Sequence, residues 1–281
     1  MRADLHSHSS VSDGTRSPAE VMRRAAAAGL DAIALTDHDT SAGIAEAARA
    51  LPAGLVLVPG MELSCRRDGH SVHMLAYLFD PGHDELAVEL ARITSARVER
   101  AQAMVERLAE LGTGVTWEQV TRIAGGGVIG RPHIARAMVA AGAIGSVEEA
   151  FTPEWIGAGG RAHVRRYALD PVRAVRLVAA AGGVSVLAHP FAQRRGWLVP
   201  EDLISELAQA GLAGVEVVHP DHEEGERLVL AGLAVRLGLA VTGGSDDHGE
   251  LTGDRIGSEF TNETNFERLL SGATGAAVLT K

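Results

Sequence analysis

Short apolar runs alternate with helical stretches over most of the chain. Within the helical stretches, apolar residues recur at spacings of three and four, whereas the runs between them suit buried strands. Strand and helix in alternation predict parallel strands joined by crossover helices, and therefore an α/β barrel. The predicted strands lie at 3–9, 32–39, 55–65, 71–79, 184–190, 214–220 and 239–248.

The first predicted helix shows a complete start signal. Ser17 can cap it, Pro18 suits its first turn and Glu20 stands at the third helical position. The apolar pattern then continues to Gly29, where we expect the helix to end.

The rhythm changes between about residue 84 and residue 162. A long amphipathic helix is predicted over 84–112, followed by shorter helices separated by glycine-rich segments at 125–127 and 157–160. We therefore predict a barrel formed by residues 1–83 and 163–281, with residues 84–162 as a mostly helical insertion that caps the substrate.

Imidazole and carboxylate groups recur where the predicted strands end. Because the carboxyl ends of parallel barrel strands meet at one mouth, we expect these groups to lie together. In a strand, residues two apart share a face, so His6 and His8 should point the same way, as should Asp246 and His248. The other members of the set are Asp13, His38, Glu62, His73 and His189.

This repetition favours a metal cluster over a set of ordinary core histidines. Burying so many polar groups without partners would cost roughly 1–3 kcal/mol for each unsatisfied one. Imidazole and carboxylate ligands without thiolate suit manganese, iron or zinc. His219 and His222 follow a strand, and we consider a role for them in substrate contact or in support of the ligands, whereas His70, His83 and His163 are expected to be structural or solvated.

Composition excludes several classes of protein. Of 281 residues, 46% are hydrophobic, and the net charge of −10 argues against a protein that coats nucleic acid. The only lysine is Lys281, so a Walker A lysine, a Schiff-base lysine and a carboxylated bridging lysine are all ruled out. The single cysteine, Cys65, makes no internal disulfide. Without a long apolar run or a signal peptide, we expect a cytoplasmic protein that does not enter a membrane.

Six motifs in this order resemble the polymerase and histidinol phosphatase (PHP) family. They are DLHSH at 4–8, TDHD at 36–39, GxE at 60–62, the strand residue His73, AHP at 188–190 and GSDxH at 244–248. The helical insertion and the segment GRPHIARAM at 130–138 resemble one branch of it, the nucleoside 3′,5′-bisphosphate phosphatases, some of which are 5′→3′ exoribonucleases on short RNA.

The resemblance implies a distorted seven-stranded barrel with two or three divalent ions, manganese first and iron or zinc as alternatives. It implies that one metal is held by His6, His8, Glu62 and Asp246, that Glu62 bridges to a second held by His73 and His189, and that a third is held by Asp13, His38 and His248. Asp13, His38, Glu62, His189 and His248 are the expected catalytic residues. By similarity, Arg131 and His133 would contact the substrate.

We therefore expect hydrolysis of a nucleotide phosphate ester by a hydroxide that bridges two metals. The expected substrates are the 3′-phosphate of nucleoside 3′,5′-bisphosphates, short 5′-phosphorylated RNA, or both, with no obligate protein partner. The alternatives are a histidinol-phosphate phosphatase or other small phosphomonoesterase, a metal-dependent amidohydrolase, and a non-catalytic metal-binding barrel. The absence of an interior lysine argues against the amidohydrolase, and the complete ligand set argues against the non-catalytic barrel.

Overall fold

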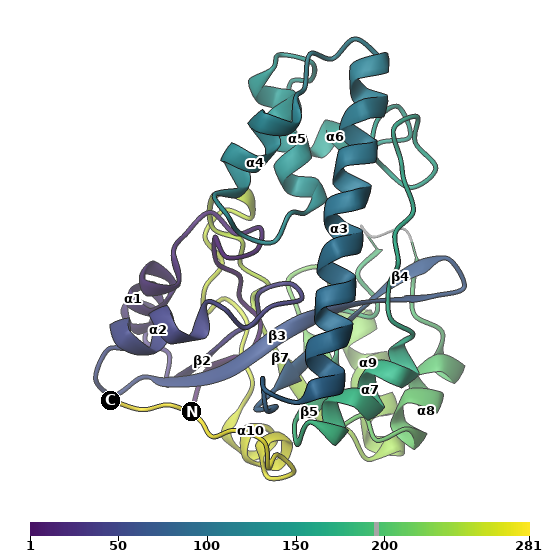
Figure 1. Cartoon of the computed structure of the whole chain (residues 1–281). Helices are drawn as coiled ribbons and strands as arrows, with labels where there is room; N and C mark the ends of the chain where they lie inside the picture. The colour runs from purple at the N-terminus through teal and green to yellow at the C-terminus, as the bar shows by residue number, and fades with distance from the viewer. Residues whose placement is uncertain (194–196) are drawn as a thin grey trace.

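The computed structural model describes residues 1–193 and 197–281. Seven strands form one sheet in chain order, nearly closed into a barrel, so the predicted α/β barrel is confirmed (Figure 1). The strands are β1 (Ala3–Asp4), β2 (Ala32–Leu35), β3 (Val56–Arg67), β4 (His70–Tyr77), β5 (Val184–Leu187), β6 (Gly214–Val218) and β7 (Ala240–Gly243).

The expectation of parallel strands throughout is wrong for β4. That strand runs antiparallel to both β3 and β5, whereas the other neighbouring pairs are parallel. The cause is the two-residue turn between β3 and β4, where Asp68 and Gly69 have φ values of 51° and 86°. Asp-Gly with positive φ at both positions is typical of a tight hairpin turn, which forces the next strand to run back.

The barrel closes where the segment after β1 meets the segment after β7. Leu5 N donates to Gly243 O at 3.3 Å, Asp246 N donates to His6 O at 2.9 Å, and His8 N donates to Asp247 O at 2.9 Å. Two of the candidate motifs, DLHSH and GSDxH, therefore form the closing seam of the barrel.

Helices cover the outside of the sheet. The predicted start of the first helix is confirmed, because Ser17 Oγ accepts a hydrogen bond from Glu20 N and α1 begins at Pro18. The helices around the barrel are α1 (Pro18–Ala27), α2 (Ile44–Ala50), α7 (Pro171–Ala180), α8 (Glu201–Gln209), α9 (Glu224–Leu237), α10 (Glu263–Leu270) and the 3-10 turn η2 (Gly249–Leu251).

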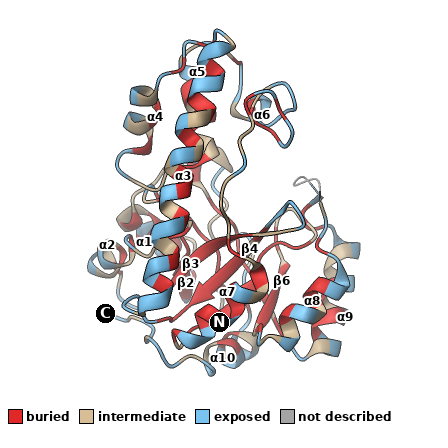
Figure 2. Cartoon of the chain, turned by 45° about the vertical axis from the view of Figure 1, so that its right-hand side comes forward, coloured by how far each residue is buried: buried red, intermediate tan, exposed pale blue. Residues whose placement is uncertain are grey.

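A second group of helices stands beyond one end of the barrel (Figure 1). It contains α3 (Asp84–Glu110), α4 (Trp117–Ala124), α5 (Arg131–Ala140) and α6 (Val147–Ala150). Leu86 and Ile93, in the first half of α3, pack into the core beside β3 and β4, whereas Met104 and Leu108, in its second half, pack with α4 and α5. Helix α3 therefore joins the two cores, and its buried stripe runs along its length (Figure 2).

The barrel interior is filled by small and medium apolar side chains. Ala3, Ala32 and Ala240 lie next to Leu75 and Val186 in one buried cluster. This packing closes the centre of the barrel and leaves the mouth near α3 for polar groups.

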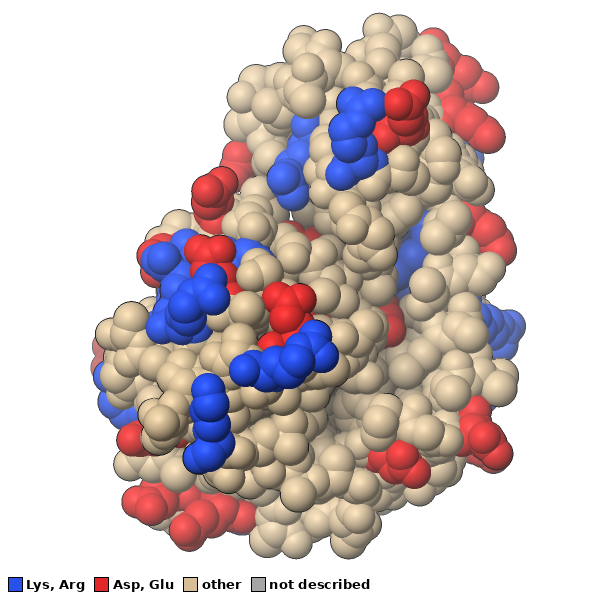
Figure 3. Space-filling view, turned by 60° about the vertical axis from the view of Figure 1, so that its left-hand side comes forward, with Lys and Arg blue, Asp and Glu red and all other residues tan. Residues whose placement is uncertain are grey.

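Basic and acidic side chains lie next to one another on the face drawn in Figure 3. In the described part of the chain, no helix is both long enough and apolar enough to cross a membrane.

Candidate metal centre

Most of the motif residues lie just beyond short strands, whereas Glu62 and His73 lie inside β3 and β4. Strand β1 ends at Asp4 and β2 at Leu35, so His6, His8 and His38 stand in the segments that follow. The predicted alternation of a strand therefore does not position His6 and His8, although their rings lie 5.2 Å apart. The antiparallel pairing of β4 positions His73, which stands opposite Ser64 in the register and two residues along from Glu62.

Glu62 lies at the centre of the cluster and is buried. Its Oε1 lies 2.6 Å from His73 Nδ1 and 3.1 Å from His189 Nε2. Its Oε2 lies 3.4 Å from His6 Nε2, 3.2 Å from His8 Nε2 and 3.1 Å from His38 Nδ1. The two oxygens thus face two different sets of imidazoles, as a carboxylate shared between two cations would.

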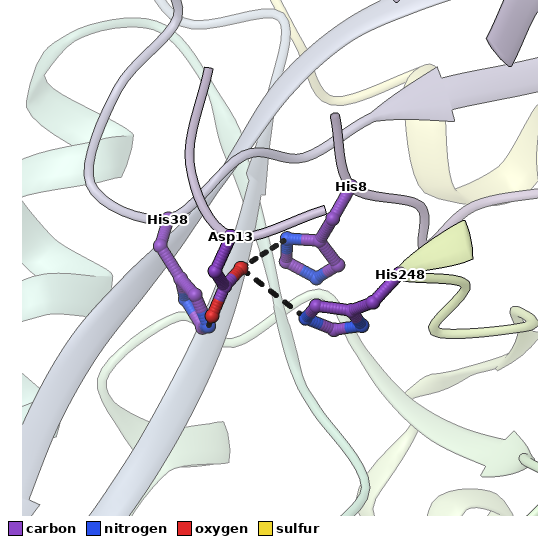
Figure 4. A group of neighbouring side chains, drawn as sticks. All are labelled: His8, Asp13, His38 and His248. Carbon is purple, nitrogen blue, oxygen red and sulfur yellow. Dashed lines mark ion pairs between the residues drawn. The ribbon is translucent and has the colours of Figure 1, made fainter. Parts of the chain in front are cut away.

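Asp13 organises a second part of the cluster (Figure 4). Its Oδ1 lies 3.3 Å from His248 Nε2 and 3.9 Å from His8 Nδ1, and its Oδ2 lies 3.7 Å from His38 Nε2. The rings of His8 and His248 stack with centroids 4.0 Å apart. The loop after β1 therefore brings its carboxylate to the same mouth.

All nine predicted ligands come together. His189 joins the others through Glu62, whose Oε1 lies 3.1 Å from His189 Nε2. Four groups among the described residues have ligand atoms within 4.8 Å of one another, one of which joins His6 to Glu216 and His219. The three that consist of predicted ligands alone are His6, His8, Glu62 and Asp246; His8, Asp13, His38 and His248; and His38, Glu62 and His73. The first matches the set expected for one metal. The second adds His8 to the set expected for the third metal, and the last shares Glu62 and His73 with the set expected for the second.

The donor set fits divalent cations. Among the described residues, His6 Nε2, His38 Nδ1 and both ring nitrogens of His8 are buried without a hydrogen-bond partner, although carboxylate oxygens lie within 4 Å of each. Nitrogen and oxygen lone pairs that converge without aligned hydrogen bonds are suited to a cation between them. Without a cation, burial of these unpaired nitrogen atoms would cost free energy.

The pKa values of the site show how strongly its groups interact. The neighbouring imidazoles hold the pKa of Glu62 well below its usual range against the effect of burial, chiefly through His73 and His38. Asp246 and Glu62 raise the pKa of His8 to about 10, although burial opposes this. Burial lowers the pKa of His38 to about 3.

Glu216 was not predicted from the sequence. It lies in β6, where its Oε1 is 3.1 Å from His6 Nδ1 and its Oε2 accepts a hydrogen bond of 2.8 Å from His189 N. The available signal was a lone carboxylate within the buried run GVEVV. Nearby, His219 Nε2 lies 3.4 Å from Asp246 Oδ2, which places His219 in support of a predicted ligand, while both ring nitrogens of His222 bond to backbone groups.

The backbone at the mouth is unusual at two predicted ligands. His189 has a φ of 29° and Asp246 a φ of 49°, backbone angles that residues other than glycine rarely adopt. Next to Asp246, a Cβ on Gly244 would lie 2.4 Å from His6 Cβ. The glycine of the GSDxH motif is therefore required for His6 to approach.

A cleft of about 640 Å³ opens over the cluster, between the barrel mouth and the segments that follow α3. Its floor includes Glu62, His73 and His248. Its walls carry arginines from four separate segments, namely Arg66, Arg97, Arg100, Arg131 and Arg166.

These arginines form a concentrated positive charge. Burial together with Arg166, Arg97, Arg131 and Arg66 lowers the pKa of Arg100 to about 8. Within the described chain, the Nε atoms of Arg66, Arg100 and Arg166 are buried and have no hydrogen-bond partner. Arg97 differs, because Asp39 accepts its Nε–H at 2.6 Å. The cluster as a whole is suited to an anion, which would both neutralise the charge and accept hydrogen bonds.

The two predicted substrate residues of α5 have different surroundings. Arg131 lines the cleft and stacks over the ring of Phe151 at 5.4 Å. His133 is buried outside the lining of the cleft, and its Nδ1 accepts a hydrogen bond from Gly130 N at the start of the helix. This bond fixes the N-terminus of α5, from which Arg131 extends.

Comparison with known proteins gives a consistent result. A model of the PHP domain family matches residues 4–113. The 3′,5′-nucleoside bisphosphate phosphatase of Chromobacterium violaceum is 35% identical over 254 residues, which cover 90% of this chain and 89% of that protein. The 5′-3′ exoribonuclease Rnm of Escherichia coli is 33% identical over 250 residues, covering 87% and 84% respectively.

A third relative and a solved structure share the same chemistry. The phosphoribosyl 1,2-cyclic phosphate 1,2-diphosphodiesterase of Eggerthella lenta is 34% identical over 259 residues, covering 89% of this chain and 95% of that protein. A crystal structure from Bifidobacterium adolescentis, assigned as a metal-dependent phosphoesterase, superposes with a TM-score of 0.90 at 34% identity and covers 97% of this chain and 96% of that one. These proteins differ in substrate but all are named for cleavage of phosphate esters.

Proposed function

Since this chain belongs to the PHP domain family, we propose that it is a metal-dependent phosphoesterase whose substrates are phosphorylated nucleotides. One observation carries the choice of substrate: the imidazole and carboxylate cluster and the arginine cluster line the same cleft. A substrate with one phosphate at the floor and a second anionic group at the wall would use both.

The geometry of the cluster supports the expected ligands. We propose that His6, His8, Glu62 and Asp246 hold one divalent ion, that Glu62 shares a second with His73 and His189, and that Asp13, His38 and His248 hold a third when it is present. Ions bound there would activate water and neutralise charge on the phosphoryl oxygens. Manganese is our first candidate, with iron and zinc as alternatives, because the donors are imidazole and carboxylate without thiolate.

Side chains of the protein would orient the substrate in the cleft. Asp13, His38, Glu62, His189 and His248 line the cleft, and we propose that they face the phosphate that reacts. Arg131, held against Phe151, and Arg100 would bind the remaining phosphate oxygens through charged hydrogen bonds. His133 Nδ1 accepts a hydrogen bond from Gly130 N at the start of α5, and contact of His133 with the substrate stays a prediction.

We propose residues 84–162 as the part that caps the substrate, with the barrel formed by residues 1–83 and 163–281. The cleft supports this division, because Arg100, Arg131 and Phe151 line one side of it and the barrel residues line the other. Location in the cytoplasm and independence from a protein partner stay predictions.

The test is a substrate panel with the manganese-loaded full chain. Phosphate release is compared for adenosine 3′,5′-bisphosphate, AMP and histidinol phosphate. Product formation is followed by chromatography for a ribose cyclic phosphate diester, which opens to a monoester, and for a short 5′-phosphorylated RNA, which would lose mononucleotides. We expect the bisphosphate or the RNA to give the highest kcat/KM, because each offers a second anion to the arginines. A preference for histidinol phosphate would contradict the proposal, and so would undiminished activity after chelation. Arg122→Ala, an exposed site on α4, is the matched control for variants in the cleft.

A further inference from the structure

Two aromatic rings stack at the outer part of the cleft. The rings of His70 and Trp197 have centroids 4.6 Å apart and planes inclined by 10°. His70 begins β4 beside the hairpin turn and is exposed, whereas Trp197 precedes α8 and packs partly against the hydrophobic core. Both line the cleft, and neither belongs to the candidate metal centre.

The hairpin of β3 and β4 fixes the order of groups along the cleft. His73 contacts Glu62 at the metal centre, and His70 stands three residues away on the same strand, which is about 10 Å at the usual rise of a strand. Between them, Ser71 pairs with Arg66 on β3. Because successive side chains of a strand leave opposite faces, His70 and His73 project from opposite faces of the ribbon, and His70 lines the outer part of the cleft, where it stacks on Trp197.

We propose that His70 and Trp197 form the platform on which the nucleobase of the substrate stacks. This inference rests on the proposed function and adds where the base binds. A nucleotide whose phosphate lies at the metal centre would place its base farther out, on the side where the stacked rings lie. Bases stack on aromatic side chains through their π-faces, which makes such a platform tolerant of base identity.

The structure also offers a purely architectural explanation, in which the stacked rings only tie the hairpin to the segment before α8. The two explanations differ in one measurable respect. An architectural tie would affect all substrates alike, whereas a base platform affects only substrates that carry a base.

The first experiment compares KM for adenosine 3′,5′-bisphosphate and for ribose 3,5-bisphosphate, which lacks the base. In Trp197→Leu we expect KM for the nucleotide to rise about ten-fold, within the range of measured base-stacking effects, while KM for the baseless sugar is unchanged. Trp197→Phe, which keeps an aromatic ring, should restore most of the difference, and His70→Ala should act in the same direction as Trp197→Leu. Equal changes for both substrates, or no change for either, would overturn the platform.

The second experiment measures the binding of monophosphates that lack the 3′-phosphate expected to react. AMP and ribose 5-phosphate are titrated calorimetrically into the manganese-loaded full chain and into Trp197→Leu. We expect AMP to bind about ten-fold more tightly than the sugar phosphate to the natural sequence, and equally to the variant. If this preference is seen but no nucleotide is hydrolysed, the platform stands and the proposed function fails. If nucleotides are hydrolysed without any base preference, the platform fails and the proposed function stands.

Discussion

Glu216 Oε1 lies 3.1 Å from Nδ1 of His6, and both residues are fully buried. With an ion bound, this contact would fix the tautomer of His6, because the hydrogen on Nδ1 is donated to Glu216 and the lone pair of Nε2 is left for the ion shared with Glu62 and Asp246. The second oxygen of Glu216 accepts from His189 N, so one carboxylate in β6 holds two predicted ligands from different segments.

Replacing Glu216 by Gln should therefore weaken metal binding without removing a ligand. The amide is uncharged, and its NH₂ group cannot accept a hydrogen bond from His189 N. Loss of such a support to a ligating histidine typically costs about 10- to 100-fold in metal affinity. Manganese affinity measured by calorimetry tests this, with the exposed Glu201→Gln as the matched control. Unchanged affinity in a folded Glu216→Gln protein would contradict the assignment.

Removing a ligand itself should have a larger effect. His8 lies within 3.3 Å of both Glu62 and Asp246, so His8→Ala or Asp246→Asn opens the group of four on which the first ion depends. We expect both variants to lose metal-dependent phosphate release by at least about 100-fold while they keep the far-ultraviolet circular dichroism of the parent. Residual activity near the parental level in either variant, with metal analysis as the companion measurement, would count against the centre.

The clustering of the site could be predicted from the sequence because six of the seven strand segments each bring a predicted imidazole or carboxylate ligand to the mouth of the barrel. Glu62, His189 and Asp246 all follow or end apolar runs. Because this pattern repeats at several strand ends, it predicts that residues far apart in the sequence lie close together in the fold. The direction of β4 was also accessible, since Asp68 and Gly69 form a hairpin signal that the helix–strand rhythm obscured.

Other parts of the site were not accessible from the sequence. The tertiary fold alone brings together Arg66 of β3, Arg100 of α3 and Arg166 of the later segment. Their spacing in the sequence therefore does not predict that they lie close together. Glu216 was visible as a lone acid in a strand, but its partner His6 is 210 positions away. His133 stays a predicted substrate contact, and the sequence did not show that its Nδ1 also accepts a hydrogen bond from Gly130 N at the start of its own helix.

Metal binding should release protons near neutral pH. In the metal-free protein the pKa of His8 is raised to about 10, so its imidazole is protonated at pH 7 and must lose a proton to bind an ion, whereas His38, with a pKa of about 3, is already neutral. Manganese affinity should therefore increase as the pH rises from 6 towards 10. Calorimetric titration in buffers of different ionisation enthalpy counts the protons released, and a binding enthalpy independent of the buffer at pH 7 would refute this account.

Arg100 should show opposite effects on stability and on substrate binding. Its lowered pKa means that the charged guanidinium is disfavoured among its like-charged neighbours in the free protein. Arg100→Met should therefore leave the melting temperature unchanged or raise it, while KM for adenosine 3′,5′-bisphosphate rises about ten-fold or more through loss of a charged hydrogen bond. Thermal unfolding and steady-state kinetics on the same preparation test both halves. A lower melting temperature with an unchanged KM would show that Arg100 serves the fold instead.

Arg97 is the arginine of the cleft that we expect to serve the fold. Its Nε donates to Asp39 at 2.6 Å and its Nη2 donates to Ser64 Oγ at 2.7 Å, which ties α3 to the barrel rim beside Glu62. Arg97→Met leaves Asp39 buried without its cation, and removal of one partner of such a pair typically costs about 3–5 kcal/mol. Urea unfolding should show a loss of this size, against a loss of less than about 0.5 kcal/mol for the exposed Arg122→Met. The double variant Arg97→Met with Asp39→Asn should recover part of the lost free energy of unfolding, because the amide of Asn is uncharged and needs no cation beside it. If the double variant recovers none of the loss, the effect of Arg97→Met comes from packing rather than from the ion pair.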